Sequence, residues 1–140
     1  MWNWLRRRTK PQAKPKQSDL KGAPSSPRTK TYSANTGYVY QYVYRGYREI
    51  SQVGSGTEYV FSVTRDRKNN FPIRIQLLDG AVATCVAAAG RELLHAEHYA
   101  LAKMTLFEAL DSISDENELQ MPLAPQGAEL EQHLRTLGRI

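Results

Sequence analysis

The sequence predicts an α+β fold: a small antiparallel sheet of three to four strands, followed by two helices packed on one face and preceded by a disordered basic tail. Segments in which aromatic and β-branched residues alternate with other residues come first, and segments with helical spacing follow. Short polar turns separate the alternating segments, which favours antiparallel neighbours. A run of strands before a run of helices is typical of α+β folds rather than parallel sheets.

The predicted tail covers residues 1–36. It carries nine Lys or Arg and one acid, Asp19, whereas residues 37–140 carry ten basic and thirteen acidic side chains. The tail contains four prolines and almost no branched apolar residues, so it buries too little apolar surface to offset the entropy lost on ordering. We therefore expect disorder up to Asn35 and order from near Gly37 onward.

The first predicted strand begins at Tyr38. Residues 38–44 alternate tyrosine with valine or glutamine, which places four tyrosines on one face of a pleated strand. Gly46 predicts a bulge or bend before the segment continues over 47–53.

Two further strands are predicted in the body. A glycine-rich turn at 54–56 precedes a strand over 58–64, and a polar turn at 66–70 precedes a strand over 71–78. Pro72 is tolerated because it lies near the start of its strand.

Helical patterns follow the strands. Asp79 is suited to cap a short alanine-rich helix over 80–89, and Gly90 is suited to end it. A longer helix is predicted over about 94–113, although no capping residue marks its start.

The chain therefore divides into a tail at 1–36, a globular domain at 37–114, and an acidic linker with a short C-terminal helix at 115–140. That last helix, over 127–137, carries a leucine stripe formed by Leu130, Leu134 and Leu137.

Composition restricts the classes of function. The single cysteine, Cys85, permits neither an intramolecular disulfide nor a CxxC metal site. No apolar run approaches the ~20 residues of a membrane span, and the N-terminus lacks a secretory pattern. We expect a cytoplasmic protein without cofactor or metal. Because no nucleophile-base pair or phosphate-binding loop is recognisable, we expect it not to be an enzyme.

Lys103 is the most unusual position in the sequence. On the long helix it falls in the middle of the side that collects Tyr99, Leu106 and Phe107. A buried ammonium must be paired, neutralised or extended to water. One interpretation is that Lys103 faces an acid or an anionic ligand in a cleft. The other is that its methylene stem covers apolar surface while its amine reaches solvent.

His95 and His98 lie three residues apart on the same helix. Metal-binding histidines on a helix are more often four apart, and Glu92 or His133 would have to supply a third ligand. Two surface histidines are therefore the favoured interpretation. A small metal-dependent or lysine-dependent enzyme around these residues and Lys103 would require a concave pocket.

The tyrosine face also has two interpretations. Exposed rings beside arginines can stack nucleobases, whereas buried rings would serve as the core that a small domain needs. Burial is favoured, and the candidate nucleic-acid-binding residues of the body are Tyr40, Tyr42, Arg48 and Arg74.

The basic tail indicates an acidic partner, with nucleic acid as the leading hypothesis, because spaced cations can follow a phosphate backbone. Its candidate residues are Arg6, Arg7, Arg8, Lys10, Lys14, Lys16, Lys21, Arg28 and Lys30. The alternative interpretation is that the basic tail is only a solvated extension without a partner. Contact of residues 1–8 with an anionic membrane surface is a further alternative, but so few residues are insufficient for stable anchoring.

The sequence thus predicts a non-catalytic interaction domain with a basic arm that contacts an acidic partner. The alternative is a protein-protein or self-assembly module, such as a homodimer, that docks through exposed tyrosines or the leucine stripe. Because acids outnumber bases in the body, any affinity for phosphate is expected to reside in the arm.

Overall fold

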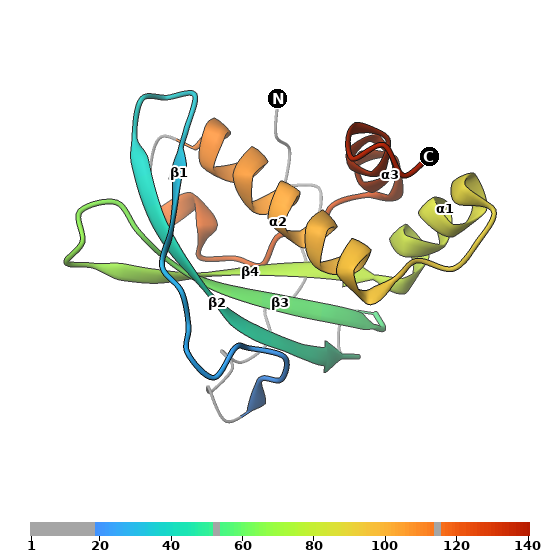
Figure 1. Cartoon of the computed structure of the whole chain (residues 1–140), viewed down its shortest axis with the longest axis horizontal. Helices are drawn as coiled ribbons and strands as arrows, with labels where there is room; N and C mark the ends of the chain where they lie inside the picture. Colours follow the sequence, from blue (N-terminus) through green and yellow to red (C-terminus); the bar gives the residue numbers. More distant parts are fainter. Residues whose placement is uncertain (1–18, 52–53, 114–115) are drawn as a thin grey trace.

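The computed structural model describes residues 19–51, 54–113 and 116–140 (Figure 1). The strands form one antiparallel sheet in the order β1-β2-β3-β4, and helices follow them, which confirms the predicted α+β class. The elements are β1 (Lys30–Ser33), β2 (Val39–Ile50), β3 (Gly56–Thr64), β4 (Asn70–Leu78), α1 (Asp79–Ala89), α2 (His95–Ser112), the 3₁₀ helix η3 (Glu116–Leu119) and α3 (Gly127–Thr136).

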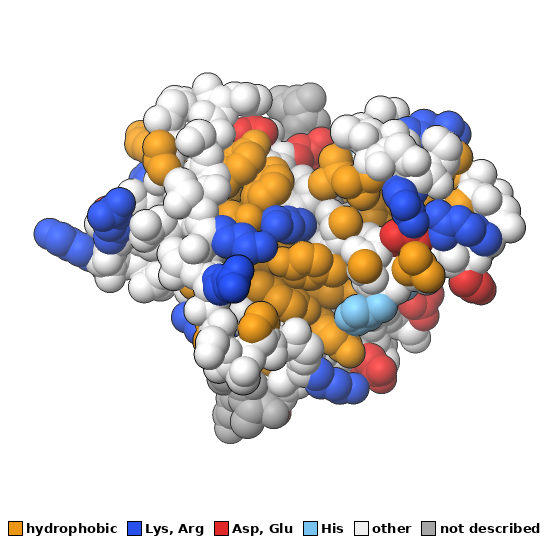
Figure 2. Space-filling model, in the orientation of Figure 1, with side chains coloured by type: hydrophobic (Ala, Val, Ile, Leu, Met, Phe, Trp, Pro, Cys, Tyr) orange, Lys and Arg blue, Asp and Glu red, His pale blue; other side chains and the backbone are white. Residues whose placement is uncertain are grey.

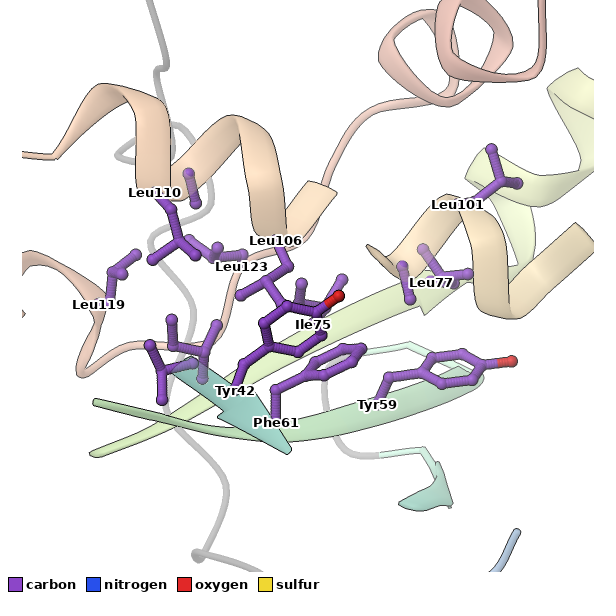
Figure 3. Packing of buried hydrophobic residues seen from close by; sticks show 14 of the residues in the cluster. Tyr42, Tyr59, Phe61, Ile75, Leu77, Leu101, Leu106, Leu110, Leu119 and Leu123 are labelled. Carbon is purple, nitrogen blue, oxygen red and sulfur yellow. The ribbon is translucent and has the colours of Figure 1, made fainter. Parts of the chain in front are cut away.

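The long helix α2 crosses one face of the sheet, while α1 and α3 pack against each other at one end (Figure 1). Sheet residues Tyr42 and Phe61 lie beneath Leu106 and Leu110 of α2 in Figure 3. All four side chains are buried. Within the described ranges, no helix combines the length and the apolar character needed to cross a membrane.

β1 lies inside the segment that was expected to be disordered. It pairs with β2, with Tyr32 opposite Tyr40. The Tyr32 ring stacks on Phe107 of α2 at a centroid distance of 4.2 Å, and its hydroxyl donates a hydrogen bond of 2.7 Å to Asp111. The predicted start of order near Gly37 is therefore wrong, because an aromatic contact and strand pairing order this segment without branched apolar residues.

A bulge between Tyr44 and Gly46 confirms the irregularity predicted at this glycine. The register changes there: Tyr44 is opposite Phe61, and Tyr47 is opposite Tyr59. Because a bulge inserts one residue, Tyr44 and Tyr47 share the face covered by α2 although they are three residues apart.

The tyrosines of β2 differ in burial. Tyr40 and Tyr42 are buried, as the core interpretation predicts, whereas Tyr44 is half-buried. Tyr38, which precedes the strand, is 46% exposed and lies under the guanidinium of Arg65, 4.3 Å from its ring centroid. Only part of the tyrosine face is therefore core.

Helix α1 begins at Asp79 itself, so the prediction that Asp79 caps it is wrong. The backbone N–H of Asp79 instead donates a hydrogen bond to the carbonyl oxygen of Ser55, in the turn before β3. This bond attaches the start of the helix to the sheet. At the other end, Gly90 has a φ of 70° and its N–H donates to Val86, which confirms the predicted left-handed stop.

Helix α2 has Leu94 rather than a small polar residue at its N-cap, and the carboxylate of Glu97 in the first turn accepts a hydrogen bond from the Leu94 backbone N–H. The Glu97 carboxylate accepts hydrogen bonds from the N–H of Leu94 and from the guanidinium groups of Arg91 and Arg139. These bonds connect the beginning of α2 to the loop before it and to the C-terminal residues.

The leucine stripe of α3 points mainly into the molecule. Leu130 and Leu134 are fully buried, and Leu137 is 39% exposed. The stripe therefore contributes to the core, and the docking surface considered from the sequence is reduced to one partly exposed leucine.

Candidate functional site

A pocket of about 160 Å³ opens between α2, β2 and the segment that precedes β1. Figure 2 shows hydrophobic side chains exposed between the positions of β1 and α2, with Lys and Arg side chains at their border. We call this the aromatic pocket, and its lining residues are Pro24, Ser26, Arg28, Lys30, Tyr42, Tyr44 and Tyr99.

Residues 21–30 form one wall because both ends of this segment are attached to β2. Lys21 and Tyr47 exchange two backbone hydrogen bonds of 2.9 Å, and Lys30 pairs with Tyr42. The basic N-terminal segment and the folded body thus meet at this pocket.

Two half-buried tyrosines, Tyr44 and Tyr99, supply the accessible aromatic surface, and Tyr42, which is only 4% exposed, also lines the pocket. The rings of Tyr44 and Tyr99 meet edge to face at a centroid distance of 4.8 Å, and Tyr42 lies edge to face with Phe107 at 5.6 Å. Burial raises the pKa of Tyr42, Tyr44 and Tyr99. All three phenols are therefore neutral near pH 7, and each hydroxyl can donate or accept a hydrogen bond.

The amine of Lys103 lies above this aromatic surface. Its Nζ is 5.9 Å from the ring centroid of Tyr42, 5.8 Å from that of Tyr99 and 5.9 Å from that of Phe107. These distances are within the ~6 Å range of cation–π attraction. The side chain is half-buried, so its stem covers apolar surface while the amine stays over the rings.

The pocket has an excess of positive charge. Burial, and next the charge of Lys30, lower the pKa of Lys103 from its ordinary value of 10.5. Among the described residues, no carboxylate forms an ion pair with Arg28, Lys30 or Lys103. Because no acid neutralises these neighbouring cations, a bound anion would stabilise their charged forms.

Arg28, Lys30 and Tyr42 are the sequence-predicted candidates that line the pocket. Lys21 is exposed beside it, with its amine 4.0 Å from Glu49 and 6.0 Å from the Tyr47 ring centroid. The other tail candidates, Arg6, Arg7, Arg8, Lys10, Lys14 and Lys16, lie outside the described residues.

Three candidates on the body lie elsewhere. Tyr40 is only 1% exposed, so its ring offers no face to a base. Arg48 and Arg74 lie on the sheet face opposite α2: the Arg48 Nε donates to Glu58 at 2.9 Å, and Arg74 donates to the carbonyl of Gln120. Strand alternation explains this placement, because their neighbours Tyr47 and Ile75 point toward the helix.

Tyr44 and Tyr99 were not among the candidate binding residues. Tyr44 belongs to the alternating tyrosine strand, and Tyr99 precedes Lys103 by four residues, which places the two on one helix face. The spacing of Tyr99 and Lys103 was visible in the sequence. The pairing of this helix face with β2 and with residues 21–30 required the tertiary structure.

The histidines lie apart from this charge cluster. His95 packs on the Tyr47 ring at 5.4 Å, and burial, followed by His95, lowers the pKa of His98. His133, a proposed third ligand, instead lies 3.6 Å from Glu108. Within the part of the chain that the structure describes, no three His, Cys, Asp or Glu side chains gather to hold a metal ion.

Comparison with protein-family models, curated proteins and solved structures finds no match to this chain. The chemistry of the pocket is therefore the basis for a functional assignment. Cations beside aromatic faces suit a ligand that combines negative charge with planar groups.

Proposed function

We propose that the protein is a non-catalytic binding domain that contacts nucleic acid through its basic N-terminal segment and the aromatic pocket. The observation that carries this proposal is that Lys30, from the basic segment, lines the same pocket as Tyr42 and Tyr99, over whose rings the Lys103 amine lies. Charge from the tail and aromatic surface from the body come together there.

The electrostatics support an anionic ligand. Burial, and next the charge of the neighbouring Lys30 ammonium, lower the pKa of Lys103 and so disfavour its charged form. A phosphate between them would replace repulsion with two charge-assisted contacts. Arg28, on the same wall, is placed to add a third contact.

Nucleic acid matches the remainder of the segment better than a small anion does. The nine Lys or Arg of residues 1–36 are spread along the chain, as are the phosphates of a nucleic acid backbone. Folded-body residues are on balance acidic, so binding should be confined to this segment and the pocket.

Fluorescence anisotropy with labelled single-stranded and duplex oligonucleotides, each at two salt concentrations, tests the proposal. Binding at low salt that weakens steeply at higher salt is expected, because phosphate contacts release counterions. A flat signal at low salt with both oligonucleotides rejects the proposal.

A matched pair of variants tests the pocket within the same assay. The double variant Arg28→Gln/Lys30→Gln removes two charges that line it, and Arg67→Gln/Lys68→Gln removes two from the exposed β3–β4 turn. We expect weaker binding only in the first variant. Equal weakening in both would mean that net charge alone determines affinity.

A further inference from the structure

We infer that the aromatic pocket holds a single unpaired nucleobase while Lys30 and Lys103 contact the adjoining phosphate. This inference rests on the proposed function and specifies the ligand of the same site. It predicts that the protein distinguishes a strand with accessible bases from other polyanions.

The size of the pocket limits what can enter. Its volume of about 160 Å³ is close to the ~150 Å³ of a protein cavity that holds one benzene ring. One ring system, with part of it extending through the mouth, fits this space. A base pair, or two stacked bases, does not.

The lining favours a planar group. The half-buried rings of Tyr44 and Tyr99, arranged edge to face, present ring surfaces in two orientations. Stacking of a base on such surfaces tolerates any sequence, because every base has a π-face. The neutral hydroxyls add donors and acceptors for the base edge.

The positions of the cations suit a base that is joined to a phosphate. Lys30 is part of the pocket wall, and the Lys103 amine lies nearly equidistant from the rings of Tyr42 and Tyr99. A nucleotide whose base contacts these rings has its phosphate within reach of both amines. A ligand with charge but no ring would leave the aromatic surface unused.

A duplex cannot satisfy this arrangement without unpairing a base, since its bases are stacked inside the helix. Single strands should therefore bind more tightly than duplexes of equal length. The same reasoning predicts weak binding to a strand that lacks bases but keeps its phosphates.

Anisotropy with the full-length protein and three oligonucleotide probes of equal length tests this inference: a single strand, an abasic single strand and a duplex. We expect the base-bearing single strand to bind roughly five-fold to 150-fold more tightly than the abasic strand, as one stacked base contributes. Equal affinity for the abasic strand and the base-bearing strand overturns the inference and leaves the proposed function standing. Failure of all three probes to bind overturns both.

Two further ligands separate alternative occupants. An acidic peptide that contains tyrosine combines charge with rings, and binding of this peptide in preference to every oligonucleotide overturns the inference. A nucleoside monophosphate that binds as tightly as the oligonucleotide shows that the site takes free nucleotides, which also overturns assignment to a strand.

A variant comparison locates the base. Tyr99→Leu keeps apolar packing but removes a ring of the pocket, whereas Tyr38→Leu removes an exposed ring outside it. We expect Tyr99→Leu to weaken binding of the base-bearing strand but not of the abasic strand, and Tyr38→Leu to change neither. If Tyr99→Leu weakens binding to both strands equally, the ring has only a structural role and the inference is overturned.

Discussion

Lys30 of β1 lies beside Lys103 of α2, and burial, followed by the charge of Lys30, lowers the pKa of the Lys103 amine. One lysine comes from the basic N-terminal segment and the other from the middle of the apolar side of the long helix. Their proximity connects two features of the sequence that have no evident relation along the chain. The charge is tolerated on that helix face because the Lys103 amine lies within cation–π range of the Tyr42, Tyr99 and Phe107 rings.

Lys103→Met should weaken oligonucleotide binding without destabilising the fold. The variant removes a partly desolvated charge that is repelled by Lys30, so its melting temperature should be unchanged or higher. With a single strand, the slope of log affinity against log salt should fall in magnitude by about 0.7, the value for one lost phosphate contact. Thermal melting and anisotropy measure the two effects.

Lys68→Met is the control for that experiment, because Lys68 is exposed in the β3–β4 turn. It removes the same charge and should leave both slope and affinity nearly unchanged. A higher melting temperature in Lys103→Met with undiminished affinity would show that Lys103 only covers apolar surface.

Gly46→Ala should detach the segment before β1 from β2. Gly46 has a φ of 116°, and a Cβ atom there would lie 2.5 Å from the carbonyl oxygen of Lys21. Gly54→Ala is a matched control, because its φ is 112° but nothing lies within 4 Å of the added Cβ. Both variants place an alanine at a positive φ, which costs ~1–3 kcal/mol, and Gly46→Ala adds the clash.

Limited trypsin digestion measures the detachment. Cleavage after Lys21, Arg28 and Lys30 should accelerate in Gly46→Ala and stay close to the wild-type rate in Gly54→Ala. If the two variants are cleaved alike, the close approach of Gly46 to Lys21 does not hold the pocket wall in place.

Leu106→Ala should destabilise the domain by ~2–5 kcal/mol, the usual range for a fully buried leucine. Leu106 packs between α2 and the sheet, where truncation leaves a cavity (Figure 3). Leu94, which is 58% exposed, provides the comparison, and Leu94→Ala should change stability by no more than about 0.5 kcal/mol. Urea denaturation gives both values, and similar losses in the two variants would refute the described packing of α2.

Acid should weaken the attachment of the C-terminal residues to α2. The guanidinium of Arg91 foremost, then the N–H of Leu94 and Arg139, hold the pKa of Glu97 well below its ordinary 4.5. Because the folded-state pKa is lowered, the stabilisation is complete above about pH 4.5 and is lost as the pH falls toward the folded-state pKa.

Glu97→Gln tests this pH dependence. The wild type should be more stable than the variant at neutral pH, and the difference should shrink near about pH 3, as measured by thermal melting. Asp66, whose pKa is also lowered, by N–H donors in its turn, is present in both proteins and cancels from the comparison. A difference that is independent of pH would mean that the Glu97 carboxylate has no part in acid sensitivity.

Local patterns predicted most of the elements. Alternation indicated β2, β3 and β4, and Gly90 marked the end of α1 because glycine readily adopts the left-handed conformation that ends a helix. The edge strand β1 was missed because its four residues carry no alternating apolar pattern. Its order comes from pairing with β2 and from the contact of Tyr32 with Phe107 and Asp111, which are distant in sequence.

Only part of the candidate site could likewise be predicted from the sequence. Lys103 stood out because its charge conflicts with the apolar side of its helix, and that conflict is visible in helical spacing alone. The participation of Arg28 and Lys30 in the same pocket depends on how residues 21–30 cross the edge of β2. No local pattern encodes such a crossing, so the sequence assigned these cations to a separate tail.

An NMR titration of the labelled full-length protein with a single-stranded oligonucleotide at low salt shows directly where the strand binds. We expect the largest shifts at the Lys103 and Lys30 side chains and at the rings of Tyr42, Tyr44 and Tyr99. Shifts in the Asp66 turn and in α3 should be small. Shifts confined to residues outside the pocket, or no shifts at saturating oligonucleotide, would rule out binding of the strand at the pocket.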